Sequence, residues 1–141
     1  MMAVLMIPAS HGEVADKITI LEIKAARISD PAKLGNVRAE LDLLGPDFFA
    51  AVKDVPGFAA LMDQLRRVNE DLWGIEDDIR DCEKARDFGD RFIALARAVY
   101  VTNDARARIK REMNLLVGSG IVEEKSYADY GAGLAAGRPE T

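Results

Sequence analysis

The sequence predicts an all-α protein, a helical bundle built on a long antiparallel α-hairpin, and three observations lead to this prediction. Apolar residues recur at alternating spacings of four and three along two long segments, about 58–86 and 90–117. A short break with Gly89 separates the two segments, so the chain can fold back on itself there. A third apolar segment, about 11–29, follows a helix start signal and is expected to pack on the hairpin as an N-terminal helix.

Length and composition are those of an ordinary single-domain protein. The chain has 141 residues, of which 49% are hydrophobic and 30% charged. We expect one helical domain over residues 1–127, beginning with a short extended arm, and a flexible C-terminal tail over residues 128–141. No apolar run approaches the roughly 20 residues that span a bilayer, so membrane insertion is not expected.

The charge and the thiol content exclude several classes of function. A net charge of −5 disfavours nucleic-acid binding, which depends on neutralising phosphates. Cys82 is the only cysteine, which excludes an internal disulfide and makes a reducing cytoplasm the expected location. With one histidine and no group of thiols, we expect no metal site and no cofactor.

The start of the chain predicts an extended arm followed by a capped helix. Residues 3–8 (AVLMIP) are rich in β-formers, and Pro8 ends this strand-like arm. Ser10 and Glu13 then form an S-x-x-E capping box. The Ser10 hydroxyl is expected to accept from the Glu13 amide, while the Glu13 side chain reaches back.

Proline and glycine divide the next part of the sequence. Asp30 and Pro31 predict the N-cap and first position of a second helix, and Gly45-Pro46 is expected to end it. A separate short helix is predicted over residues 47–55, before Pro56-Gly57. After the last long helix, residues 118–120 (GSG) form a stop, and residues 121–127 (IVEEKSY) could dock on the body.

The two long segments carry matching heptad seams. The first seam consists of Leu61, Leu65, Val68, Leu72, Ile75, Ile79 and Cys82. The second consists of Phe92, Leu95, Val99, Thr102, Arg106, Ile109, Met113 and Leu116. Folding at the turn pairs Cys82 with Phe92 and Leu61 with Met113 in one constant register. Residues 70–83 are acidic and residues 106–111 basic, which favours the antiparallel arrangement.

A polar layer interrupts this apolar seam. The predicted register brings Asn69, Thr102, Asn103 and Arg106 to one level. A buried guanidinium needs a partner, because leaving it unpaired costs several kcal/mol. Either a carboxylate of the bundle neutralises Arg106, or the layer lines a cavity for an anionic ligand, or Arg106 extends to water.

The first helix carries cations within a wide apolar sector, so they are expected at helix interfaces. Lys17, Lys24 and Arg27 could join Arg106 and Lys110 around one cleft. An internal salt-bridge network is the more common alternative, with the acidic groups Asp16, Glu22, Glu70, Asp71 and Asp104 as possible partners. The predicted ligand-binding residues are Lys17, Lys24, Arg27, Asn69, Asn103, Asp104, Arg106 and Lys110.

The stretches IPASHGEVADKITILEIKAARI, LWGIEDDIR, FIALARAVYVTNDARARIKREMN and GSGIVEEKSY carry a family likeness. Over about residues 7–127 the chain resembles a family of short bacterial proteins of unknown function with the N-terminal motif V-P-x-S-x-G-E-x-x-D-K-I-T-I-L-E-I-K. The resemblance implies no established activity, and it hints at a setting in surface-glycan assembly. The positions that match its motifs are Ser10, Gly12, Glu13, Asp16, Lys17, Glu22, Lys24, Arg27, Asn103, Asp104 and Lys110.

Two functions are consistent with these patterns. The first is a cytoplasmic interaction module, expected to be a homo-oligomer, that binds a protein partner or an anionic small molecule. The second is a small metal-free enzyme acting on an anionic metabolite, in the manner of an all-α chorismate mutase. Such an enzyme needs no nucleophile, since preorganised Arg and Lys side chains can stabilise a developing charge. The sequence leaves the question of catalysis open.

Overall fold

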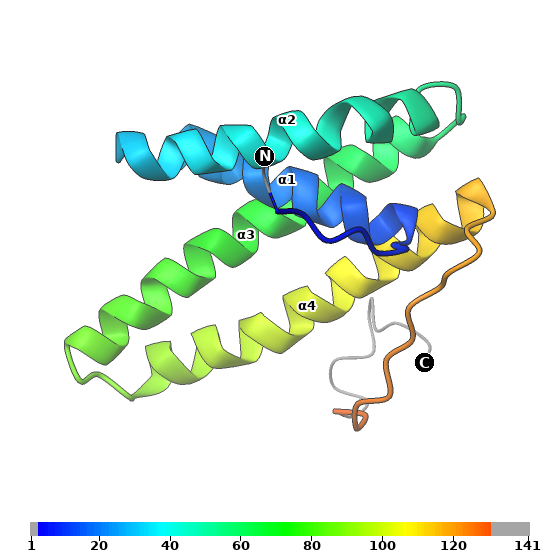
Figure 1. The fold of residues 1–141 in the computed structure, drawn as a ribbon. Coiled ribbons are helices and arrows are strands. Elements are labelled where there is room, and N and C mark those ends of the chain that lie inside the picture. Colours follow the sequence, from blue (N-terminus) through cyan, green and yellow to red (C-terminus); the bar gives the residue numbers. More distant parts are fainter. Residues whose placement is uncertain (1–2, 131–141) are drawn as a thin grey trace.

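The computed structural model describes residues 3–130, and within this range the chain folds into four helices (Figure 1). They are α1 (His11–Arg27), α2 (Pro31–Val52), α3 (Phe58–Lys84) and α4 (Asp90–Val117). This arrangement confirms the predicted all-α bundle, and the bounds of α3 and α4 lie close to those expected for the hairpin. None of the described helices is long and apolar enough to cross a membrane.

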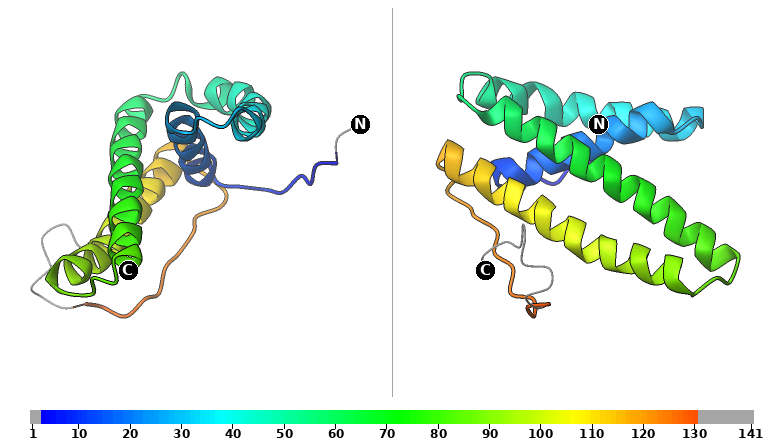
Figure 2. Two further views of the ribbon diagram at one scale, coloured as in Figure 1. Left: turned by 90° about the vertical axis from the view of Figure 1, so that its left-hand side faces the viewer. Right: turned by 180° about the vertical axis from the view of Figure 1, so that it is seen from behind.

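The hairpin of α3 and α4 forms the frame of the molecule. The two helices run antiparallel from the turn at residues 85–89 and diverge towards the other end (Figure 1). At that wide end α1 packs against both of them, and α2 covers α1 from the other side (Figures 1 and 2). The N-terminal helix is therefore central, as its wide apolar sector predicts.

The hydrophobic core lies where all four helices meet. Ile18, Leu65 and Met113 are fully buried there and come from α1, α3 and α4. Burying a side chain of this size contributes about 1.5–3 kcal/mol, so this junction is the main source of stability. The other buried members of the core are Ala15, Phe48, Val52, Phe58, Met62 and Ile109.

The prediction that Gly45-Pro46 ends the second helix is wrong. α2 continues through Pro46 to Val52, so the separate short helix expected over residues 47–55 is its last part. Pro46 costs the helix a hydrogen bond, about 3 kcal/mol in a helix interior. The apolar stripe of α2 continues across it, however, since Phe48 and Val52 are buried in the core. Burial of these two side chains offsets the cost of the proline.

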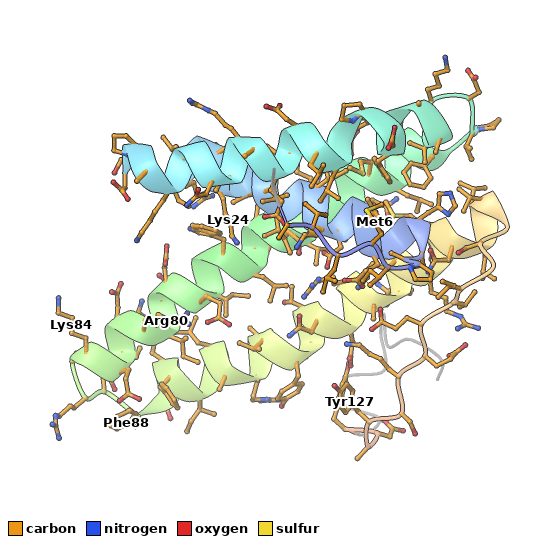
Figure 3. All side chains as sticks on the ribbon, in the orientation of Figure 1. Met6, Lys24, Arg80, Lys84, Phe88 and Tyr127 are labelled. Carbon is orange, nitrogen blue, oxygen red and sulfur yellow. The ribbon has the colours of Figure 1, made fainter. Side chains whose placement is uncertain are left out.

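The helix ends largely follow their local signals. The Ser10 hydroxyl accepts from the Glu13 amide at 3.1 Å, as the capping box predicts. α1 ends at Arg27, two residues before the expected bound, and α4 ends at Val117, where Gly118 caps it with a left-handed φ of 68°. Residues 3–10 are extended and belong to no strand, and Leu5 and Met6 of this arm are exposed (Figure 3).

Candidate anion-binding site

A buried carboxylate, Asp16 of α1, is the centre of the polar layer. Its side chain is only 3% exposed, and it accepts hydrogen bonds from Arg106 of α4 through Nε, at 2.9 Å, and Nη2. Asn69 of α3 donates to Asp16 Oδ1 at 2.9 Å and to the Thr19 hydroxyl at 2.8 Å. Asp16 therefore ties three helices together at one level, and a carboxylate of the bundle neutralises Arg106.

The protonation states of this layer follow from its contacts. Burial by itself raises the pKa of Asp16, but the hydrogen bonds from Arg106 and Asn69, with the nearby positive charges, bring this pKa below its usual 3.8. The bond to Asp16 raises the pKa of Arg106 despite its burial. The layer is thus a charged, paired network at neutral pH.

Lys110, one turn further along α4, extends this network towards the surface. Its side chain is 12% exposed, and its ammonium lies 2.7 Å from Glu13, 3.7 Å from Asp16 and 3.4 Å from Glu123. Burial lowers the pKa of Lys110, but the bond to Glu13 and the surrounding carboxylates more than offset this, so the pKa is raised. The capping box predicted that the Glu13 side chain reaches back to the start of the helix. Its carboxylate pairs with Lys110 instead.

A close approach of α1 to α4 holds these groups in place. The Gly12 amide donates to Asn114 Oδ1 at 2.7 Å, in a buried contact between the two helices. A Cβ at Gly12 would lie 2.5 Å from the Lys110 carbonyl oxygen, which is closer than such atoms approach. Glycine at this position therefore sets the distance at which Glu13 and Asp16 reach the side chains of α4.

The C-terminal segment lies back along α4 and encloses a pocket. Residues 121–127 dock on the body, as the sequence suggested, and Glu124 pairs there with Arg111. A pocket of about 240 Å³ lies between this segment and α4, and Tyr127 lies at the segment's end (Figure 3). Its lining residues are Asn103, Arg106, Ala107, Lys110, Arg111, Asn114, Glu123, Lys125 and Tyr127.

Cations dominate the charged lining of this pocket. Four basic side chains face one carboxylate, Glu123. Arg106 and Lys110 are held from behind by Asp16 and Glu13, whereas the Arg111 side chain is 44% exposed. Arginine has five N–H donors, and the Arg111 bond to Glu124 uses only one of them. The pocket can therefore present the remaining N–H donors of these paired cations to an anionic group.

Half of the predicted site residues meet at this network. They are Asn69, Asn103, Arg106 and Lys110, with Asn103 accepting from Arg106 Nη1 at 3.3 Å. The sequence left two alternatives for Arg106, an internal salt bridge or a place in a pocket. Both describe this region, because Arg106 pairs with Asp16 on one side and lines the pocket on the other.

The other four predicted residues lie elsewhere. Lys17 pairs with Glu40 of α2 at 2.8 Å, and Arg27 pairs with Glu70 and lies over the Trp73 ring. Among the described residues, Lys24 and Asp104 make no hydrogen bond or ion pair with the network, and Figure 3 shows Lys24 far from Tyr127. The expectation of one cleft ringed by all these cations is therefore wrong. Lys17 and Arg27 point instead to carboxylates of α2 and α3.

Several residues of the site were not among those predicted from the sequence. Asp16 was considered only as a possible partner, although it is the centre of the network. Glu123 and Lys125 belong to a segment without helical periodicity, so no pattern placed them beside α4. Asp16 borders the apolar sector of α1 and matches a motif position of the family resemblance, and these were the available signals for it.

No group of three His, Cys, Asp or Glu side chains is arranged to hold a metal ion within residues 3–130. Comparison of the chain with protein-family models, curated proteins and solved structures finds no significant match.

Proposed function

We propose that this protein is a helical-bundle binding module that takes an anionic small molecule in the pocket between α4 and residues 121–127. The observation that supports this most directly is the lining of four cations against one carboxylate, Glu123. Asp16, Glu13 and Glu124 pair with three of these cations, so the pocket offers an anion N–H donors on oriented side chains rather than a net positive charge.

The buried network supports the same proposal through preorganisation. Asp16 and Glu13 hold Arg106 and Lys110 in fixed positions before any ligand arrives. A ligand then does not have to order those two long side chains, which otherwise costs about 0.5–1.5 kcal/mol for each one. Arg111 and Lys125 add donors nearer the solvent.

The chemistry of the lining favours a phosphate-bearing ligand. Arginine forms paired hydrogen bonds with phosphate oxygens, and lysine adds a point charge. The family resemblance hints at surface-glycan assembly, and nucleotide sugars, which carry a diphosphate, belong to that setting. We therefore propose a phosphorylated metabolite of this kind, bound in the cytoplasm.

Thermal unfolding in the presence of inorganic phosphate, pyrophosphate, citrate and a nucleoside-diphosphate sugar tests the proposal. At least one of these probes should raise the Tm of the wild type. The double variant Arg111→Ala/Lys125→Ala should lose that increase. Lys33→Ala/Arg38→Ala is its matched control, since it removes the same charge from exposed positions of α2. This control should keep the increase.

Glu123→Gln gives the opposite expectation. Removal of the only carboxylate in the lining should strengthen anion binding about tenfold, because Lys110 and the ligand no longer share the pocket with a negative charge. Isothermal titration with the best probe measures this. If no anion raises the Tm, or if the Arg111→Ala/Lys125→Ala variant binds as well as its control, the proposal is wrong.

A further inference from the structure

Within residues 3–130, no third helix covers the far half of the hairpin. We call this part the hairpin arm and define it as residues 74–84 of α3 and 90–101 of α4. It extends beyond α1 and α2 to the turn that carries Phe88, with Arg80 and Lys84 at its end (Figures 1 and 3). Within it only Cys82 is fully buried. The seam residues Ile75, Ile79, Phe92, Leu95 and Val99 remain half-buried.

A two-helix ribbon cannot bury its own seam. Seam residues of a helical bundle become buried when further helices cover them, as the other end of this hairpin demonstrates. There α1 covers α3 and α4, and Leu65 and Met113 are fully buried. On α4 of the arm, Ile93 and Tyr100 are exposed as well, at 53% and 43%. The arm therefore presents apolar surface that a further pair of helices would cover.

We propose that a second copy of this chain supplies these helices, so that two hairpin arms pack side by side as an antiparallel four-helix bundle. The arm of each copy would then receive two further helices from its partner. A two-fold axis makes every contact occur twice, which is the usual symmetry of homodimers.

The charges of the arm favour a second copy and also select its orientation. Residues 74–84 of α3 contain five acidic and two basic residues. Residues 90–101 of α4 contain one acidic and two basic residues. Each hairpin therefore carries one negative and one positive helix, and the partner's α4 complements α3. Contact between the two α3 helices would place like charges together, so α3 should lie against α4 of the other copy.

Light scattering over a range of protein concentrations tests this arrangement. The wild type should have the mass of two chains and should dissociate on dilution. Asp77→Lys reverses an exposed charge on α3 of the arm and should raise the dissociation constant about tenfold, because the two-fold axis repeats the lost contact. Arg97 is an exposed residue in the middle of the arm on α4. The double variant Asp77→Lys/Arg97→Glu should therefore have a dissociation constant close to that of the wild type.

The pair Lys33→Glu and Asp42→Lys provides the matched control, because these exposed residues of α2 lie outside the arm. Neither change should alter the dissociation constant. A single-chain mass at every concentration overturns the proposal. The proposal is also overturned if Asp77→Lys leaves the dissociation constant unchanged while the changes on α2 alter it, because the interface would then lie elsewhere.

Discussion

Asp16 shows how one buried charge can organise a small bundle. It lies on α1, and its carboxylate is held by side chains of α3 and α4 while its backbone carbonyl accepts from Thr19. A buried carboxylate is costly unless it is both paired and hydrogen-bonded, and here both conditions are met. The residue therefore contributes to the position of α1 as much as to its stability.

Removal of Arg106 tests the strength of this pairing. Arg106→Ala should lower the free energy of unfolding by about 3 kcal/mol, since it leaves a buried carboxylate with only Asn69 and the more distant Lys110. Asp16→Asn should cost less, because the Arg106 side chain is 29% exposed and can turn to water. Urea unfolding measures both.

The double variant and a surface control complete this test. Asp16→Asn/Arg106→Ala should lose at least about 1 kcal/mol less than the sum of the single losses, because the two residues act as a pair. Arg80→Ala, which breaks an exposed pair with Glu76, should cost under about 0.5 kcal/mol. If the losses of unfolding free energy for Asp16→Asn and Arg106→Ala were additive, the two residues would not stabilise the fold as a pair.

The lowered pKa of Asp16 predicts a stability that depends on pH in the acid range. The folded state holds this carboxylate ionised below pH 3.8, where the unfolded chain already takes up a proton. Its contribution is thus complete above about pH 4 and is lost as the pH falls through the lowered pKa. Unfolding curves between about pH 5 and pH 2 should decline more steeply for the wild type than for Asp16→Asn. Parallel profiles would contradict the assignment.

At the scale of the element, α2 and the contact of α1 with α4 show two ways in which packing governs a helix. α2 passes through Pro46 because its buried stripe continues on both sides. α1 approaches α4 closely because Gly12 has no side chain. In both places a neighbour in space, rather than the local sequence, decides the outcome.

Gly12 gives a prediction with a matched control on another helix. Gly12→Ala places a methyl group 2.5 Å from the Lys110 carbonyl oxygen and should lower the free energy of unfolding by about 1–3 kcal/mol. Gly35→Ala introduces the same methyl group on α2, where nothing lies within 4 Å. It should stabilise the protein by about 0.5–1 kcal/mol, as alanine does in a helix interior. Effects of the same sign, measured by urea unfolding, would contradict this account.

At the scale of the whole molecule, the chain divides into a body and a hairpin arm of unequal burial. The body contains the four-helix core and the polar network, and the pocket lies at its edge. The arm has a half-buried seam and, in the part of the chain that the structure describes, no further helix over it. Local opening free energies follow the density of buried contacts, so the two parts should differ in stability.

Hydrogen exchange should reveal this division. In dilute protein, amides of residues 76–98 should exchange at least about tenfold faster than those of residues 15–23, which lie in the core helix α1. At higher concentration the arm should become protected if a second copy covers it, whereas α1 should stay unchanged. Uniform protection at all concentrations would contradict the division into body and arm.

By itself the sequence determined α1, α3 and α4 and the order of the elements, but it divided α2 at Gly45-Pro46. Two heptad seams, a capping signal at Ser10 and stops at Gly57 and Gly118 are local patterns, and local patterns suffice to predict helices. The polar layer was also predictable in part, because Thr102 and Arg106 interrupt the apolar seam of residues 90–117. A residue that breaks a regular pattern is visible without coordinates.

Only the tertiary structure decided which charges face each other. Lys17 and Lys110 are both lysines on apolar helices, yet one pairs with Glu40 on α2 and the other with Glu13 and Asp16. The tertiary structure also places Glu123, which belongs to an irregular segment, in the lining of the pocket. Helix periodicity gives the face on which a side chain lies, but the partner of a charge depends on how the helices cross, and that depends on the packing of the whole core.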